Sequence, residues 1–251
     1  MRKTFLLAFA LVISVFATKG QEIRPNFPDG FHLGLNLQGN LSQRADIIPI
    51  GNITESSLKA SPKIGYDFGI EASYHFAKYF GMSVGVDLAS GLAVNVQRKS
   101  GNENVSVLNL CNRTLEVPIR FEFHYPIMKS NFSFYGALGV SFNNLFRHGV
   151  SSSGLTINEE SENFHLWITD RKFEKINATM QMRLGVYYRL PYNDLLRMSI
   201  TSNYTFRDKL QGSYKYKDES GALTYRHNYM GLELSYIHCF HTKEQKEGRG
   251  R

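Results

Sequence analysis

The stretch Thr114–Pro126, TLEVPIRFEFHYP, decides the fold of this chain, because apolar and polar side chains alternate strictly along it. The apolar positions are Leu115, Val117, Ile119, Phe121, Phe123 and Tyr125. The positions between them include Glu116, Arg120, Glu122 and His124. Successive side chains of a β-strand point to opposite faces. The period of two therefore predicts a strand that separates an apolar environment from a polar one.

The same alternation recurs in seven other segments, 31–41, 64–76, 82–98, 132–146, 176–190, 195–209 and 225–240. Their connections alternate in length. Short turns follow the second, fourth and sixth strands, and long polar connections follow the others, at 42–63, 99–112, 147–175 and 210–224. We expect these long connections to be loops. Eight alternating strands joined in this way predict an all-β, antiparallel up-and-down β-barrel.

Alternation alone leaves two kinds of barrel open, a soluble lipocalin-like barrel with an apolar cavity and a transmembrane barrel with a polar interior. Three features favour the transmembrane barrel. The strands are long enough to cross a bilayer, and aromatic residues collect near their ends. Glycines also gather on the polar face, where a crowded interior needs small residues. They are Gly34, Gly65, Gly69, Gly85, Gly139, Gly185 and Gly231.

The polar face then lines the barrel interior, where six acidic and four basic residues nearly cancel in charge. They are Asp67, Glu71, Asp87, Glu116, Glu122 and Glu233, with Arg120, Arg183, Arg189 and Arg197. Buried charges persist only when they are paired and hydrogen-bonded. We therefore predict a packed, salt-bridged lumen rather than a wide pore.

The apolar face of the same strands is expected to contact outer-membrane lipids. Its predicted lipid-facing residues include Leu115, Val117, Ile119, Phe121, Phe123, Met182, Leu184, Leu232 and Leu234. An arginine on such a face near the bilayer midplane would cost about 2–4 kcal/mol. None of the predicted strands places an arginine near the midplane of this face.

The two ends of the chain differ from the barrel in composition. Arg2 and Lys3 precede the apolar run Phe5–Ala17, which predicts a signal peptide over residues 1–20. Residues 21–30 are expected to be a periplasmic lead, 31–240 the barrel, and 241–251 a charged, disordered tail. The short turns and both termini are then periplasmic, and the long connections face outward.

Several other functions are disfavoured by the sequence. The formal charge of +7 falls to +4 without Arg2, Lys3 and Lys19, and the remaining basic residues are scattered, so we expect no nucleic-acid binding. We expect no metal and no cofactor, because no ligand spacing matches a known template. The cysteines, Cys111 and Cys239, fall at opposite ends of the predicted barrel and are expected to be free thiols.

An enzyme is also disfavoured. Some barrels of this size carry a hydrolase triad on the outer wall, but His32, His75 and His124 fall on the inward face. Only His238 has outward parity, and it lies at the predicted periplasmic end.

Several stretches resemble the outer-membrane β-barrel family of Bacteroidota. They are KGQE at 19–22, YHFAKYFGMSVGVDL at 74–88, LEVPIRFEFHYP at 115–126, FYGALGVSFNNLF at 134–146 and YMGLELSY at 229–236. RPNFPDGFHLG at 24–34 is similar to PorT-like members. The resemblance implies an outer-membrane protein tied to type IX secretion and gliding, with no catalytic residues.

Our leading hypothesis is therefore a non-enzymatic, integral outer-membrane barrel with a structural or accessory role in an envelope or secretion complex. The alternatives are an outer-membrane lipid-modifying enzyme, a narrow channel, and a soluble ligand-binding barrel.

Overall fold

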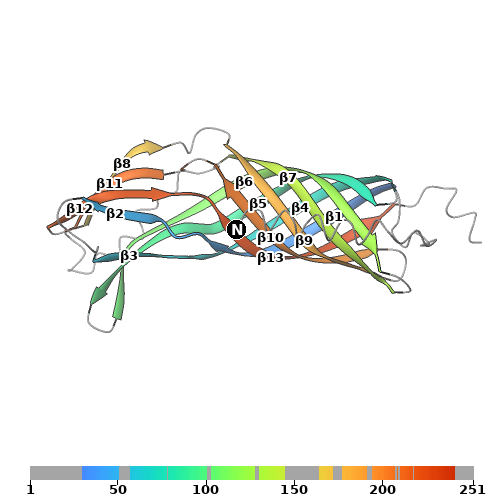
Figure 1. The fold of residues 1–251 in the computed structure, drawn as a ribbon, viewed down its shortest axis with the longest axis horizontal. Coiled ribbons are helices and arrows are strands. Elements are labelled where there is room, and N and C mark those ends of the chain that lie inside the picture. Colours follow the sequence, from blue (N-terminus) through green and yellow to red (C-terminus); the bar gives the residue numbers. More distant parts are fainter. Residues whose placement is uncertain are drawn as a thin grey trace, which may run out of the picture.

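The computed structural model describes residues 30–50, 57–77, 79–100, 103–127, 130–144, 164–171, 177–190, 194–206, 208, 210–216 and 218–240. Its regular elements are all strands (Figure 1). They are β1 (Gly30–Ser42), β2 (Asp46–Ile50), β3 (Leu58–Ser61), β4 (Ile64–Ala77), β5 (Phe80–Ser100), β6 (Glu103–Pro126), β7 (Phe132–Asn144), β8 (Phe164–Arg171), β9 (Asn177–Arg189), β10 (Leu195–Thr205), β11 (Leu210–Tyr216), β12 (Glu219–Tyr225) and β13 (Tyr229–Cys239). The described part of the chain contains no helix long and apolar enough to cross a membrane.

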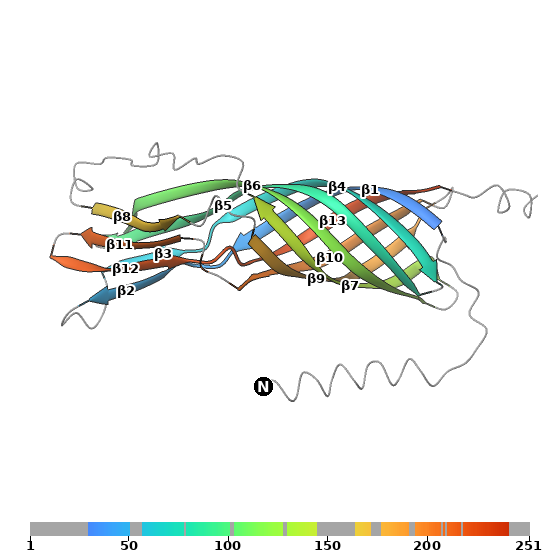
Figure 2. The same ribbon diagram turned by 90° about the horizontal axis from the view of Figure 1, so that it is seen from above.

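Eight of these strands close into a barrel, which confirms the predicted fold class. Hydrogen-bonded neighbours follow the order β5-β4-β1-β13-β10-β9-β7-β6, and β6 pairs with β5 to complete the circle. Every neighbouring pair is antiparallel. The tilted strands cross one another from the near and far walls in Figure 2. Closure leaves the barrel wall without an unpaired edge, as a bilayer requires.

The pleat of the wall places apolar side chains outside and polar ones inside. Phe121 is 48% exposed, whereas the next residue, Glu122, is 1% exposed. The same contrast holds for Leu232, at 66%, and Glu233, at 2%. A soluble lipocalin-like barrel has the opposite arrangement, so that alternative is excluded by the fold. An apolar belt of this kind is stable only where lipid surrounds the barrel.

The long connections after β1, β5 and β10 are not simple loops, and our prediction for them was wrong. β5 and β6 run past the barrel to Ser100 and Glu103, so residues 103–112 are strand. β3 pairs with β5, and a separate four-stranded sheet has the order β2-β12-β11-β8. This sheet and the ends of β3, β5 and β6 form an extension beyond one end of the barrel (Figures 1 and 2). β8 likewise lies within the predicted loop 147–175.

The extension has its own buried side chains. Tyr214, Tyr216, Leu223 and Tyr225 are each no more than 2% exposed. The buried Glu219 accepts hydrogen bonds from Tyr214 Oη, at 2.6 Å, and from the backbone and hydroxyl of Ser57, at 2.9 and 2.7 Å. Strands of four to eight residues with many polar and glycine positions read as loops in the sequence. The boundaries shift accordingly: β10 ends at Thr205 rather than 209, and β13 begins at Tyr229 rather than 225.

Three predicted segments lie outside the described residues. They are the signal peptide at 1–20, the part of the lead before Gly30, and the tail at 241–251. Cys239 is a free, buried thiol, while the side chain of Cys111 also lies outside the description.

Glycine lets neighbouring backbones approach closely at Gly139, on the inner face of β7. A Cβ atom there would collide with the carbonyl oxygen of Ile119 and would lie 2.8 Å from Arg120 Cα. Neither backbone atom can move without disturbing the β6–β7 ladder. At Gly136, on the outer face of the same strand, a Cβ would meet only Leu184 Cδ2, at 3.6 Å.

We therefore expect Gly139→Ala to lower the free energy of unfolding by about 1–3 kcal/mol, as overpacking does. Gly136→Ala is the matched control and should cost much less. Urea unfolding of the refolded barrel in micelles, followed by the gel shift between folded and unfolded bands, measures both. Equal midpoints for the two variants would show that the β6–β7 approach is looser than described.

Candidate functional site

A cluster of charged side chains fills the middle of the lumen. Glu71, Asp87, Arg120, Arg183, Arg197 and Glu233 come from six different strands, β4, β5, β6, β9, β10 and β13. All are buried, and Arg197 is fully so. Three carboxylates thus face three guanidinium groups, and the cluster has no net charge. The two remaining strands contribute Asn36 from β1 and Tyr135 from β7.

Arg197 lies at the centre of this cluster. Its Nη1 is 2.6 Å from Glu71 Oε1, and its Nη2 is 2.9 Å from Glu233 Oε1. Nη2 also donates to Asn36 Oδ1, at 3.3 Å, and the guanidinium carbon lies 4.8 Å from the centre of the Tyr135 ring. One side chain therefore joins four strands besides its own.

The other two arginines complete the pairing. Arg120 donates from Nη1 to Glu71 Oε2, at 2.9 Å, and from Nη2 to Asp87 Oδ2, at 3.0 Å. Arg183 Nη2 is 2.6 Å from Glu233 Oε2, and its Nη1 is 3.3 Å from Glu71 Oε2. Arg183 Nη2 also lies 3.8 Å from Asp87 Oδ2. Each carboxylate thus meets at least two guanidinium groups, which offsets the cost of burying the charges.

A second tier lies between this cluster and the extension, around Glu116. The Glu116 carboxylate accepts hydrogen bonds from Tyr229 Oη, at 3.0 Å, from Gln181 Nε2, at 3.2 Å, and from Asn203 Nδ2, at 3.4 Å. His227 Nε2 lies 3.2 Å from its other oxygen. Gln181 connects the tiers, because its Oε1 accepts from Arg120 Nε at 3.1 Å.

A third tier lies toward the turn end of the barrel and contains histidines. His32, His75 and His124 are at most 2% exposed. The ring centres of His32 and His75 are 4.7 Å apart, and those of His75 and His124 are 4.8 Å apart. His75 Nε2 lies 3.1 Å from Glu122 Oε2, and Tyr135 Oη donates to Glu122 Oε1 at 3.3 Å. The histidines therefore lie inside the barrel, as their parity predicts.

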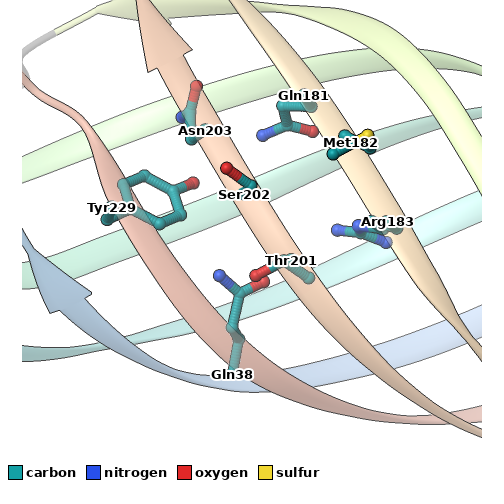
Figure 3. Close-up of a pocket in the computed structure, with 8 residues that line it drawn as sticks. All are labelled: Gln38, Gln181, Met182, Arg183, Thr201, Ser202, Asn203 and Tyr229. Atoms are coloured by element: carbon teal, nitrogen blue, oxygen red, sulfur yellow. The ribbon is translucent and has the colours of Figure 1, made fainter. Parts of the chain in front are cut away.

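These tiers leave little open space in the lumen. Figure 3 shows a narrow hollow beside β9, β10 and β13, into which Gln38, Arg183, Thr201, Asn203 and Tyr229 project. The hollow is too tight to hold a water molecule. The described lumen is therefore packed with side chains.

The structure separates the ten predicted lumen charges into groups. Six form the central cluster, Glu122 lies with the histidines, and Glu116 and Asp67 lie in the outer tier, where both carboxyl groups are buried. Arg189 lies apart from these groups in register. It lies half-buried at the end of β9, where it pairs in register with Leu195, two residues before Arg197. Parity assigns a face of the wall but no depth along the barrel axis.

The predicted lipid-facing residues all lie on the outer face of the wall. Ile119, Phe121, Phe123, Leu184, Leu232 and Leu234 are exposed, while Leu115, Val117 and Met182 are half-buried.

Sequence reasoning missed the neutral partners of the charges. Asn36, Tyr135, Gln181, Asn203 and Tyr229 share the inward parity of the charged residues, and that parity is the signal that would have found them. We had also not connected His227 with Glu116, because His227 lies in the segment before β13.

A separate polar cluster lies on the outer surface at the turn end. Asp194, which precedes β10, accepts hydrogen bonds from Tyr236 Oη at 2.5 Å and from the backbone N–H of Cys239 at 3.4 Å. Its Oδ1 lies 2.9 Å from His238 Nδ1. Partial burial acts to raise the pKa of Asp194, but these contacts outweigh it and hold the pKa below its usual value.

A lowered pKa in the folded state means that ionised Asp194 stabilises the fold. This contribution is complete above the unfolded pKa of about 3.9 and is lost as the pH falls through the folded value. We expect Asp194→Asn to lower the urea midpoint at pH 7, with the difference from wild type vanishing in strong acid. Midpoints measured between pH 7 and pH 2 test this. A difference that persists unchanged at pH 2 would contradict it.

Comparison with known proteins agrees with this geometry. Residues 20–211 match the family model described as the outer membrane protein beta-barrel domain. The chain belongs to this family. It is thus an outer-membrane β-barrel protein, and that part of the localisation prediction is confirmed. No curated protein sequence matches the chain.

Solved outer-membrane barrels are similar in structure. The outer membrane protein OprG from Pseudomonas aeruginosa superposes with a TM-score of 0.54 at 16% identity, over 86% of this chain and 99% of that chain. AlkL, determined in DMPC lipid bilayers, gives a TM-score of 0.44 at 12% identity, over 86% and 93%. Ail of Yersinia pestis gives 0.34 at 10% identity, over 84% and 99%. At 16% identity the likeness to OprG is evidence for a shared fold alone.

Proposed function

We propose that this protein is a non-conducting, non-enzymatic outer-membrane anchor that presents its extension to another component of the envelope. The observation that carries the proposal is the central lumen cluster, in which side chains from all eight barrel strands meet around Arg197. A lumen filled by ion pairs and hydrogen bonds between all the strands supports a rigid scaffold rather than an open channel.

The size of the extension supports the proposal that it is presented to another component of the envelope. A barrel needs only strands of about 9–11 residues to span the bilayer, but β5 and β6 have 21 and 24 residues. The excess length builds a folded platform with its own tyrosine-rich core. In our proposed orientation the short turns and both termini are periplasmic, and the platform faces outward.

The partner that we propose is a type IX secretion or gliding complex of the Bacteroidota. The similarity of residues 24–34 to PorT-like proteins, and of the strand sequences to Bacteroidota outer-membrane barrels, supports this assignment. The proposed role is an accessory one, because the resemblance to this family implies no catalytic residues.

Planar-bilayer recordings test the sealed lumen. The refolded, full-length protein should give no stable conductance steps at 1 M KCl. A narrow-channel function would instead give reproducible single-channel steps, and these would overturn the anchor.

A separate experiment tests the partner. Outer membranes are cross-linked and solubilised, and the tagged protein is recovered from wild-type cells and from cells in which a Gly-Ser turn replaces residues 210–225. We expect secretion-complex subunits to be recovered with the wild type and lost with the shortened protein. A gel-shift assay verifies that the shortened barrel folds. Normal secretion and motility in a deletion strain would contradict the accessory role.

A further inference from the structure

The outward face of the barrel wall carries an ionisable residue near its turn end. There His238 of β13 faces outward beside apolar and aromatic side chains. It is 54% exposed on β13. Polar groups on a lipid-facing surface are costly and call for a functional explanation.

Aromatic side chains show where the bilayer surface meets this end of the barrel. Ring pairs surround the turn end, with centres 5.7 Å apart for Phe31 and Phe240 and 4.9 Å apart for Phe132 and Tyr188. Such girdles lie at the level of the lipid headgroups. His238 is part of this girdle, since its ring packs edge-on against Phe240 with centres 4.8 Å apart. Its imidazole therefore lies at headgroup depth.

The imidazole is also held in a fixed orientation. Asp194, with a side chain only 15% exposed, has its Oδ1 2.9 Å from His238 Nδ1. Nδ1 therefore carries the proton and donates a hydrogen bond to the carboxylate. This leaves Nε2 as the ring nitrogen available to a ligand. In the doubly protonated ring, Nε2–H is a second donor. Asp194 is itself fixed by Tyr236 and by the backbone of Cys239.

We propose that Asp194, Tyr236 and His238 form a binding site for the phosphate of a membrane phospholipid. In the doubly protonated ring, His238 Nε2–H donates to a phosphodiester oxygen, and Asp194 orients the ring. The acyl chains lie along the apolar wall beside β13, over Leu33 of β1 and Leu196 of β10, which flank His238 and Tyr236 in register. The site rests on the membrane position of the barrel and is independent of any envelope partner.

Native mass spectrometry of the refolded, full-length protein in detergent tests this site. The probes are phosphatidylethanolamine, phosphatidylglycerol, diacylglycerol with the same acyl chains, and inorganic phosphate. We expect one retained phospholipid per barrel, little retention of diacylglycerol and none of inorganic phosphate. His238→Ala should weaken phospholipid retention roughly tenfold, the order that a charge-assisted hydrogen bond contributes.

Two further variants keep the test decisive. His238→Phe removes the donor but suits an aromatic girdle, so it should fold even if His238→Ala does not. Phe123→Ala, an aromatic truncation on β6, is the control and should leave retention unchanged. Unchanged retention in His238→Phe, or equal retention of diacylglycerol, would overturn the site. Binding of inorganic phosphate without lipid would assign it to the free anion instead.

Discussion

Replacing Arg197 by methionine is expected to lower the free energy of unfolding by about 3–5 kcal/mol, because breaking a buried ion pair leaves an uncompensated charge. Methionine fills much of the volume but donates no hydrogen bond. Glu233 would keep Arg183, and Glu71 would keep Arg120 and Arg183. The cluster would nevertheless carry an excess negative charge in a site that water does not reach.

The matched control for this substitution is Arg226→Met. Arg226 also forms an ion pair, with its Nε 2.6 Å from Asp208 Oδ1, but its side chain is 45% exposed. Exposed pairs contribute little to stability, because solvent screens the charges. Urea midpoints of both variants in the same micelles give the comparison. If Arg197→Met were no more harmful than Arg226→Met, the lumen cluster would not hold the barrel together.

The second large effect is expected on the opposite face of the wall. Leu184→Arg should cost about 2–4 kcal/mol in a bilayer, since it places a guanidinium near the middle of the lipid-facing surface. Leu184 is 56% exposed and lies near the middle of β9, next to the inward-facing Arg183. An arginine is thus stabilised by ion pairs at position 183, on the inner face. At position 184, on the outer face, it would destabilise the barrel.

Phe206→Arg serves as the control for depth. Phe206 is 66% exposed and directly follows β10 at the extension end, where an arginine should cost only about 0–1 kcal/mol. Folding efficiency into vesicles and urea midpoints measure the difference between the two variants. Equal losses of stability for the two variants would mean that the cost of an exposed arginine does not depend on its depth in the membrane.

Alternation was sufficient to predict the barrel because each strand separates lipid from a packed lumen. At Phe121, Glu122 and Phe123 the two environments differ so strongly that the face of each residue follows from its parity. Antiparallel closure then follows from the short turns. The same reasoning placed His32, His75 and His124 inside the barrel.

Parity assigns a residue to the inner or outer face, but it could not predict how far along the barrel axis the residue lies. Arg189 and Arg197 share the inward face, yet only Arg197 reaches Glu71, because the register of β9 and β10 places Arg189 beside Leu195. Register depends on contacts between strands, which a single sequence does not show. The extension was missed for a related reason. Tyr214, Tyr216 and Tyr225 form a core only when short strands from distant parts of the chain meet.

The most direct test of the inside-out packing is nitroxide accessibility at neighbouring positions of one strand. Spin labels are placed singly at Phe121 and Glu122 of the barrel in vesicles, after both native cysteines are replaced by serine. The label at 121 should collide readily with oxygen dissolved in lipid and be shielded from a water-soluble nickel chelate. The label at 122 should be immobile and shielded from both reagents. A label at 122 open to lipid, with the label at 121 enclosed, would contradict the structure.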